Sequence, residues 1–235
     1  MGTDHQGLLH FSSLAALPGL VHAVTTRGVS REAAAEALGP LRTLHQVHGS
    51  RIVAAEADGD QIPTEAVRAD GLSTNHRGGP VLGVLGADCP GVLLVAPEVG
   101  ALAVLHAGWR GVVAGIVPGA LHLLAARYGA DPEQLRVGIG PGISGPRYEV
   151  SEEVADAVAA SVGPDERDTV LTPGRPGHAH ADLRAAIRAQ LLRRGVRAAH
   201  IETHPACTYD DPRFYSYRRE GPETGRHLLL AGWRA

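Results

Sequence analysis

The sequence predicts an α/β protein with a mixed sheet, and two observations carry that prediction. Short apolar segments rich in valine and leucine interleave along the chain with segments whose apolar residues recur at helical spacing. Three apolar segments, at residues 81–86, 91–96 and 101–106, follow each other at roughly ten-residue spacing. This spacing leaves no room for crossover helices, so we expect these strands to be buried neighbours in a sheet that is not purely parallel.

Each further element follows from a local pattern of residues. Apolar runs predict strands at residues 20–26, 51–56, 136–140, 199–203 and 227–233. Helical spacing predicts helices at residues 31–38, 112–128, 151–162 and 181–194. Pro118 is expected to kink or break the second of these helices. Residues 170–179 are rich in proline and glycine, and we expect a loop there.

The composition excludes several classes of function. A chain of 235 residues can bury a sizeable core, and nothing in the sequence requires a second domain. We therefore expect one domain over residues 1–235. A net charge of −3 gives no general attraction to nucleic acid or to anionic membranes, and we expect neither partner. All 22 basic residues are arginine, and the absence of lysine removes Schiff-base chemistry and the lysine of a P-loop.

The cysteines and the N-terminal residues indicate the cellular compartment. Cys89 and Cys207 are too few for the disulfide framework of a secreted protein. The first residues, MGTDHQGLLHF, have neither the basic start nor the apolar core of a signal peptide. The most apolar region, residues 91–108, is interrupted by Pro97 and Glu98 and predicts two buried strands rather than a membrane span. We therefore expect a soluble cytoplasmic protein.

Thirteen histidines invite a metal-binding interpretation, but most have no neighbouring ligand in the sequence. A zinc site needs several converging ligands. The histidines that stand alone are His5, His10, His22, His76, His122, His200 and His227. His178 and His180 would share a face in an extended segment, but they lie in the stretch expected to be an exposed loop.

Three residues at predicted strand edges form a better candidate. His48 lies in LHQVHGSRIV before a glycine and a strand, Cys89 lies between two strands in GADCPGVLLV, and His106 ends the buried run ALAVLH. A rigid scaffold can bring such positions together. Two histidines and a thiolate would leave a fourth position open, as a catalytic zinc site requires. Asp88 could orient a histidine ligand, or it could only cap a turn.

The residues alone do not decide the role of Cys89. A cysteine nucleophile with His106 as its base needs only hydrogen-bond proximity. A free cysteine is also among the residue types most often buried in cores. A blue-copper centre uses a similar ligand set but usually adds a methionine, and the only methionine is Met1. Ligand, nucleophile and core thiol therefore stay open, with redox copper chemistry poorly supported.

Other features suit an anionic, planar ligand. The strand, glycine turn and helix around Gly108 could present backbone N–H groups to a phosphate. Arginine candidates for bidentate contacts to such a group are Arg27, Arg110, Arg218 and Arg219. The segment CTYDDPRFYSYRRE, residues 207–220, holds three of the five tyrosines together with arginines, a composition suited to stacking a small planar molecule.

These motifs together resemble the laccase-domain family, also called polyphenol oxidase, peptidoglycan-editing factor or purine nucleoside phosphorylase. The resemblance spans nearly the whole chain in the family's order. The matching motifs are TTRGVS (25–30), QVHGSRIV (46–53), ADGLST (69–74), ADCPGVLLV (87–95), HAGWRGVVAGI (106–116), IGPGISGPRYEV (139–150), DLRAAIRAQLLRRGV (182–196), and CTYDDPRFYSYRRE with TGR (207–226).

The resemblance implies a single α/β domain whose mixed sheets pack between helical layers, an α/β/β/α arrangement. It implies that zinc is held by His48, Cys89 and His106, which would also be catalytic, and copper is the alternative metal. It further implies phosphorolysis of adenosine, inosine and methylthioadenosine by phosphate, together with adenosine deamination. Substrate contacts would come from Arg27, Gln46, Arg110 and Arg218.

The sequence also departs from the family pattern. Residues 30–43 form a shorter segment than usual, and Gly142, Arg147 and Ile187 replace residue types common in the family. None of these is a proposed metal ligand, so the departures bear on substrate preference.

Three hypotheses remain: a zinc-dependent nucleoside enzyme, a cysteine hydrolase or peptidoglycan-peptide editing enzyme using Cys89 and His106, and a noncatalytic metal-stabilised factor of the cell wall or of division. A copper-dependent polyphenol oxidase is the least supported alternative.

Overall fold

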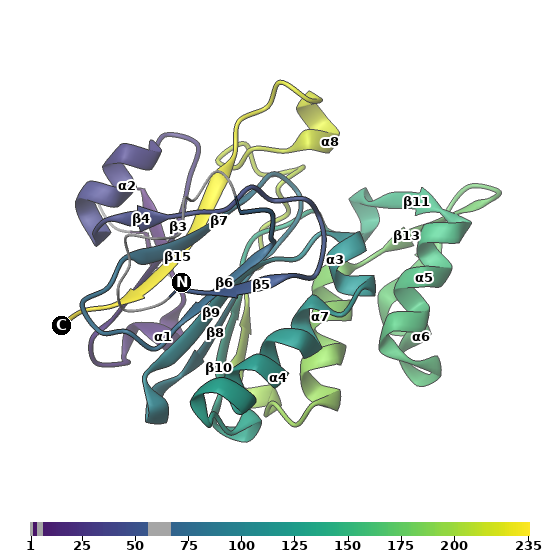
Figure 1. The fold of residues 1–235 in the computed structure, drawn as a ribbon. Coiled ribbons are helices and arrows are strands. Elements are labelled where there is room, and N and C mark those ends of the chain that lie inside the picture. The colour runs from purple at the N-terminus through teal and green to yellow at the C-terminus, as the bar shows by residue number, and fades with distance from the viewer. Residues whose placement is uncertain (1, 4–6, 56–66) are drawn as a thin grey trace.

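Strands form the centre of the protein and helices cover it, as the interleaved pattern of the sequence predicts (Figure 1). The computed structural model describes residues 2–3, 7–55 and 67–235. His5 and Glu56, the last residue of the strand expected at 51–56, lie outside these ranges. Among these residues, none of the helices combines the length and the apolar composition that a membrane span requires.

The described residues form two large mixed sheets and a small antiparallel one. The first sheet has the order β1 (Gly2–Thr3), β2 (Leu8–His10), β3 (Leu20–Thr25), β15 (His227–Trp233), β7 (Val81–Gly86) and β4 (Leu41–Arg42). The second has the order β14 (Ile201–Thr203), β10 (Arg136–Ile139), β8 (Gly91–Ala96), β9 (Ala101–His106), β6 (Gly71–Thr74) and β5 (Ile52–Ala54). Each large sheet contains both parallel and antiparallel pairs, which confirms the expected mixed topology.

Alternation along the strands of the second sheet explains the layers. In β8, Val92 and Leu94 face the core shared with the helices, whereas Leu93 and Val95 face the core shared with the first sheet. Both faces of β8 are therefore buried, which is why its sequence is continuously apolar. The covering helices are α3 (Trp109–Val113), α4 (Ile116–Tyr128), α5 (Glu152–Val162) and α7 (Leu183–Arg193).

A second helical layer covers the opposite side of the molecule. Helix α2 (Arg31–Leu38) contributes Ala34 to the core on the outer face of the first sheet, a cluster that also includes Val21 and Leu230. The Ser30 side chain accepts a hydrogen bond from the Ala33 N–H and fixes the start of this helix. The architecture is thus helix, sheet, sheet, helix, and the expected α/β/β/α arrangement is confirmed.

One expected strand neighbour is wrong. Strands β8 and β9 pair as predicted, but β7 belongs to the first sheet, where it pairs with β15 and β4. The turn between β7 and β8 carries the chain from one sheet to the other. Asp88 has a positive φ of 89° in this turn, and Cys89 follows it directly. Sequence spacing alone shows no sheet exchange, because both strands are equally apolar.

The helix expected at residues 112–128 is interrupted, but not at Pro118. The chain forms α3, breaks at Gly115 with a φ of 81°, and continues as α4. Pro118 is the third residue of α4, where a backbone N–H has no intrahelical partner and a proline costs little. Gly115 can adopt the left-handed conformation that ends α3, so it makes the break.

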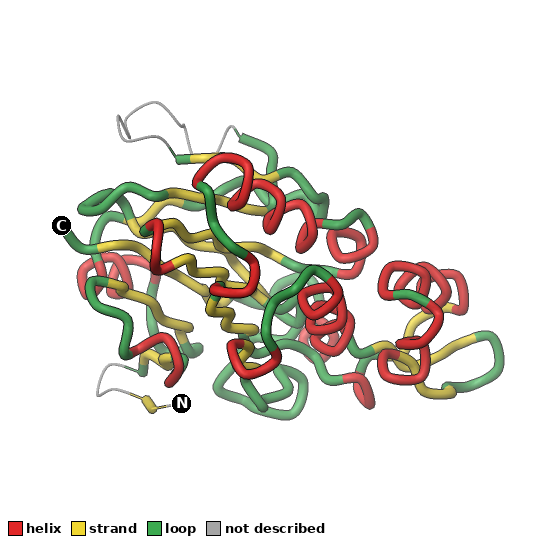
Figure 2. The backbone as a smooth tube through the Cα atoms, turned by 90° about the horizontal axis from the view of Figure 1, so that it is seen from below, coloured by secondary structure: helices red, strands yellow, loops and turns green. Residues whose placement is uncertain are grey.

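The loop expected at residues 170–179 is largely wrong. Helix α6 (Arg167–Val170) precedes β12 (Leu171–Pro173), and β13 (His178–Ala181) pairs with both β12 and β11 (Glu149–Ser151). His178 and His180 therefore lie on a strand, not in an exposed loop. The two views show this small sheet with α5 and α6 at one end of the molecule (Figures 1 and 2). The pairing with β11, distant in sequence, outweighs the local preference of proline and glycine for turns.

Candidate metal centre

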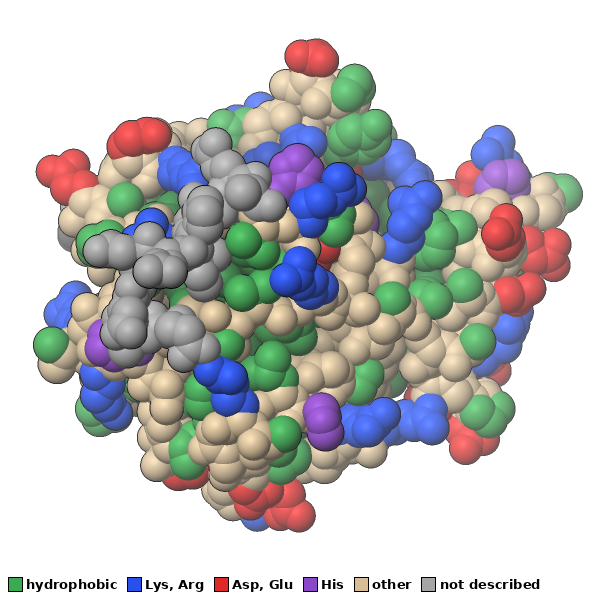
Figure 3. Space-filling model, in the orientation of Figure 1, with side chains coloured by type: hydrophobic (Ala, Val, Ile, Leu, Met, Phe, Trp, Pro, Cys, Tyr) green, Lys and Arg blue, Asp and Glu red, His purple; other side chains and the backbone are tan. Residues whose placement is uncertain are grey.

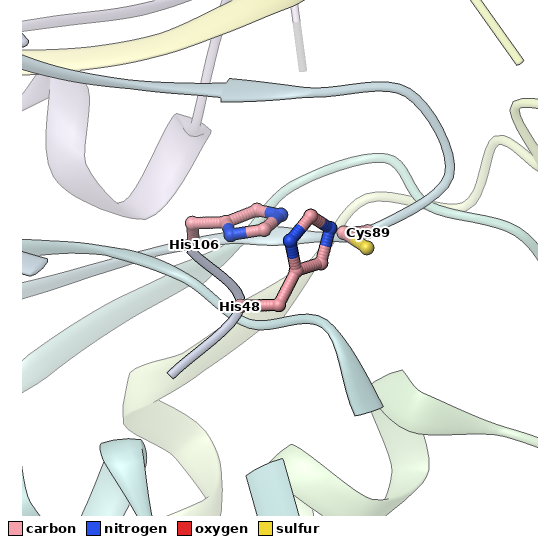
Figure 4. A group of neighbouring side chains, drawn as sticks. All are labelled: His48, Cys89 and His106. Atoms are coloured by element: carbon pink, nitrogen blue, oxygen red, sulfur yellow. The ribbon is translucent and has the colours of Figure 1, made fainter. Parts of the chain in front are cut away.

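His48, Cys89 and His106 converge. Their potential ligand atoms all lie within 4.8 Å of one another, and no other such group of three occurs among the described residues. His48 comes from the loop before β5, Cys89 from the turn between β7 and β8, and His106 from the end of β9. Figure 4 shows the two imidazole rings and the thiol side by side. The predicted convergence at strand edges is confirmed, and the metal-binding and catalytic roles stay predictions.

The buried carboxylate of Asp70 organises this group. The His106 Nδ1–H donates to Asp70 Oδ1 over 2.9 Å, and both side chains are almost fully buried. An ionised carboxylate only accepts hydrogen bonds, so Nδ1 carries a proton and Nε2 is the ring nitrogen left for another partner. Sequence reasoning considered Asp88 for this role, but Asp88 contacts Thr208 and Arg218 instead. Asp70 is in the matching motif ADGLST, where nothing local marks it as a partner of His106.

The same carboxylate shapes the loop that carries His48. Asp70 accepts hydrogen bonds from the backbone N–H groups of Val47, His48 and Gly49, at 3.2, 2.8 and 2.7 Å. His48 has a positive φ of 60°, a conformation that a residue with a side chain adopts at a cost. Asp70 offsets this cost by satisfying three partly buried donors at once, and it thereby fixes both histidines relative to each other.

The electrostatics of the group favour a thiolate. Burial raises the pKa of Cys89, but hydrogen bonds from His106 and His48 outweigh burial and lower it to about 7. Burial lowers the pKa of His106, but Asp70 and Cys89 outweigh burial and raise it to about 9. Burial likewise acts to raise the pKa of Asp70, and the hydrogen bonds from His106, Gly49 and Val47 bring it below its usual value. The metal-free group therefore favours the thiolate more strongly than an isolated cysteine does.

Two glycines allow the start of α3 to approach the group and the loop that carries His48. A Cβ atom on Gly108 would lie 2.9 Å from Cys89 Sγ and 3.3 Å from the His48 ring. A Cβ on Gly111 would lie 2.7 Å from the Gly49 carbonyl oxygen. Real Cβ atoms do not make contacts below 3.0 Å, so the close approach depends on glycine at both positions. The expected strand, glycine turn and helix is confirmed, with Gly108 as the N-cap of α3.

The predicted substrate-binding arginines fall into two groups. Arg110 stacks on Trp109, and Arg218 stacks on Tyr148 and donates to the Glu149 carbonyl oxygen. Neither has a carboxylate partner among the described residues. Both are exposed, and both act electrostatically on Tyr148, as Cys89 does. Arginine side chains in blue gather near the centre of the face shown in Figure 3.

Arg27 and Gln46, by contrast, already have protein partners. Arg27 bonds to Glu220 and stacks on Tyr215 at 4.5 Å. Hydrogen bonds from Thr224, Arg219 and Arg27 lower the pKa of Glu220 to about 2. The Gln46 amide donates to the Leu85 carbonyl and accepts from the Leu85 N–H, as a strand residue would. Their contact with substrate stays a prediction.

Tyr148 borders the same region and was not identified from the sequence. Burial, followed by the charge of Cys89, raises the pKa of Tyr148 to about 12, so its hydroxyl stays protonated at neutral pH. The ring lies within electrostatic reach of the thiol and of the two arginines. Only the stacking under Arg218 marks this tyrosine, and that contact joins residues 70 positions apart in sequence.

Comparison with known proteins identifies the family. The family model described as multi-copper polyphenol oxidoreductase laccase matches residues 22–234. The purine nucleoside phosphorylase SCO2081 of Streptomyces coelicolor is 39% identical over 208 residues, covering 87% of this chain and 80% of that protein. A purine nucleoside phosphorylase of Deinococcus radiodurans is 37% identical over 190 residues, covering 80% of this chain and 68% of that protein.

Solved structures agree with the sequence comparison. The crystal structure of YlmD from Geobacillus stearothermophilus matches with a TM-score of 0.88 at 29% identity, covering 100% of this chain and 98% of that one. The match extends over all the layers that position the three converging residues. The chain therefore belongs to the multi-copper polyphenol oxidoreductase laccase family, as its motifs predict.

Proposed function

We propose that this protein is a zinc-dependent purine nucleoside phosphorylase that also deaminates adenosine. The convergence of His48, Cys89 and His106 carries the proposal. Relatives named purine nucleoside phosphorylase support the reaction class. The proposed substrates are adenosine, inosine and methylthioadenosine, with phosphate as the second substrate. The two free cysteines fit a reducing cytoplasm, where we place the enzyme.

The donor set suits zinc. Two imidazole nitrogens and a thiolate are zinc ligands, and three protein ligands leave a fourth position open. Zinc bound by these ligands would supply a Lewis acid and would lower the pKa of water toward neutrality, which deamination requires. The family description names copper. A blue-copper centre usually adds a methionine, and the part of the chain that the structure describes contains none, which makes zinc the better match there.

The protein's own residues supply the remaining chemistry. Asp70 keeps the proton of His106 on Nδ1, so that Nε2 stays available as a ligand. Arg110 and Arg218 have guanidinium donors without carboxylate partners in the described part of the chain, and they bind the phosphate. Such donors stabilise the negative charge of phosphate at the attacked ribose carbon, where positioning supplies much of the rate enhancement.

Elemental analysis and product chromatography test the proposal together. We expect about one zinc per chain, and we expect Cys89→Ala to lose it. Adenosine incubated with phosphate should give adenine and ribose 1-phosphate, and adenosine alone should give inosine. A metal-free preparation that still consumes nucleosides contradicts the proposal. If elemental analysis finds one copper per chain instead of zinc, the proposed metal is wrong, and copper, the metal that the family description names, takes its place.

A cysteine hydrolase is the second candidate, and one observation favours it. Cys89, His106 and Asp70 form a connected series in which the thiol pKa is lowered and the imidazole is oriented by a carboxylate. That arrangement is also the nucleophile, base and orienting group of a cysteine hydrolase. Peptidoglycan peptides are the substrates to test. Activity that survives chelation and disappears on alkylation of Cys89 would establish this candidate in place of the first.

A noncatalytic protein would give a third outcome in the same measurements of zinc content and reaction products. A metal-stabilised factor of the cell wall or of division would bind zinc stoichiometrically and unfold when the zinc is removed. It would leave adenosine, inosine and peptidoglycan peptides unchanged.

A further inference from the structure

We propose that Asp88 is a positioning residue that fixes Arg218 relative to Cys89, so that the metal ligand and the phosphate-binding arginine form one unit. The inference rests on the proposed function, because that function gives Arg218 its role. It assigns to Asp88 a task different from orienting a histidine, which Asp70 performs.

The two carboxylate oxygens of Asp88 are both engaged. Oδ1 accepts a hydrogen bond from the Thr208 hydroxyl over 2.7 Å, and Oδ2 accepts one from the Arg218 backbone N–H over 2.6 Å. The Asp88 carbonyl oxygen accepts from the Ile143 N–H over 2.9 Å. Asp88 is only 8% exposed. One buried side chain thus joins the turn that carries Cys89 to two segments more than 100 positions later in the sequence.

The hydrogen bond to Arg218 reaches the start of helix α8 (Tyr217–Glu220). The second residue of a helix has a backbone N–H without an intrahelical partner. The Ser216 side chain accepts from the Arg219 N–H, and Asp88 accepts from the Arg218 N–H. Asp88 therefore supplements the Ser216 cap from another part of the chain, by satisfying the second free N–H of α8.

The backbone of Asp88 indicates that this arrangement has a cost. Its φ of 89° is unfavourable for a residue with a side chain, whereas a glycine would adopt it freely. An aspartate at such a position persists when its surroundings stabilise it. His48 is the other described residue besides glycine with a positive φ, and it belongs to the candidate metal centre. Both unfavourable conformations therefore lie at or beside a predicted ligand.

Asp88 fixes the backbone of Arg218, and two further contacts hold its guanidinium. Nη1 donates to the Glu149 carbonyl oxygen over 3.1 Å, and the guanidinium lies 5.2 Å above the Tyr148 ring. These contacts orient the group but leave other N–H donors for an anion. Asp88 and Cys89 are consecutive, so their Cα atoms are about 3.8 Å apart. A displacement of Asp88 would therefore move the arginine and the thiol relative to each other.

Asp88→Asn tests this role, because asparagine tolerates a positive φ and has the same shape. The neutral amide can still pair with the Thr208 hydroxyl through its N–H, but the charge-assisted hydrogen bond that the carboxylate accepts from the Arg218 N–H is lost or replaced by a weaker one to the amide oxygen. We expect the KM for inorganic phosphate to rise about tenfold in phosphorolysis, the effect of losing one hydrogen bond to a charged group. We expect kcat to change less than twofold and the zinc content to stay at the wild-type value.

Three further variants make the test specific. Asp156→Asn removes an exposed carboxylate of α5 that pairs with Arg167 of α6. This control should leave the KM for phosphate and kcat unchanged. Thr208→Val removes the other partner of Asp88 and should raise the KM for phosphate less than Asp88→Asn does. Arg218→Gln should raise the KM for phosphate, and combining it with Asp88→Asn should add no further increase. Additive effects in that double variant would overturn the proposal.

A readout without turnover separates this proposal from the proposed function. Hydrogen exchange at the Arg218 amide should be at least tenfold faster in Asp88→Asn than in the wild type, and calorimetry should show weaker binding of inorganic phosphate. If the wild type binds phosphate but converts no nucleoside, the function fails and these measurements still test Asp88. Unchanged exchange, unchanged phosphate binding, or a wild type that binds no phosphate would each overturn the role of Asp88. Loss of zinc in Asp88→Asn would also overturn it, because the residue would then support the metal site itself.

Discussion

The protein buries histidines in two different ways. At the candidate metal centre, His106 donates to the carboxylate of Asp70, and its pKa is raised to about 9. Near the core between the two large sheets, His22, His204 and His227 lie against phenylalanine rings instead. Burial alone does not decide the charge of an imidazole, because all four side chains are at most 5% exposed.

The histidines near the phenylalanines show what burial does without a carboxylate. Burial, followed by the charge of His10, lowers the pKa of His22 to about 4. Burial, followed by nearby arginines, lowers the pKa of His204 to about 4 and that of His227 to about 3. These residues stay neutral and serve as packing groups. The difference teaches that the bonded partner, rather than the number of histidines, distinguishes a functional site.

The largest expected effect comes from removing Asp70, the carboxylate that distinguishes the candidate metal centre from the histidines packed against phenylalanine rings. Asp70→Asn replaces a fully buried carboxylate with an amide that has one acceptor for four donors. We expect zinc affinity to fall roughly 10–100-fold and the free energy of unfolding to fall by about 3 kcal/mol. Competition with a chelator and urea denaturation measure these effects. Asp156→Asn is the matched control. If both variants lose zinc affinity and stability equally, Asp70 does not organise the candidate metal centre.

Lowering the pH should destabilise the protein through His22, His204 and His227. Their folded pKa values lie below the unfolded value of 6.5, so the unfolded state binds more protons at intermediate pH. Stability is therefore present above pH 6.5 and is lost as the pH falls toward 4. We expect the free energy of unfolding to fall by up to about 1.4 kcal/mol per pH unit for each of the three histidines. Urea denaturation of wild type and His22→Gln measures this slope, and the variant should lose about one third of it. Equal slopes would contradict the assignment.

A smaller effect is expected where the backbone approaches the site. Gly108→Ala places a Cβ 2.9 Å from Cys89 Sγ, so the thiol or the turn must shift. We expect zinc affinity to fall about tenfold with little change in urea stability. In the control Gly119→Ala the new Cβ meets no atom within 4 Å, and helix α4 should gain about 0.5–1 kcal/mol. If the two variants bind zinc equally well, the approach of Gly108 is not critical.

The smallest effect should come from His227. Its Nδ1 is buried without a hydrogen-bond partner among the described residues. His227→Leu removes this unsatisfied atom, and we expect the free energy of unfolding to rise by about 0.5–1 kcal/mol. The zinc content should stay at the wild-type value, in contrast to Asp70→Asn. A destabilised variant would show that the imidazole makes a favourable contact after all.

The sequence by itself determined the local elements and the ligand candidates. Continuous apolar runs predicted β7, β8, β9 and β15 with their observed bounds, because buried strands need apolar side chains on both faces. Helix α2 also begins and ends where its alanine-rich pattern predicts, and the structure adds Ser30 as its N-cap. His48, Cys89 and His106 were identified because each lies beside such a strand, next to a turn residue.

The tertiary structure decided how these pieces pair. It placed β7 in another sheet than β8, and it formed β12 and β13 from a stretch with the composition of a loop. It also selected Asp70, rather than Asp88, as the partner of His106, and it assigned Asp88 to Arg218. These contacts join residues 36 and 130 positions apart. Local sequence cannot specify them, because hydrogen-bond partners depend on which strands meet, and that is set by burying the whole core at once.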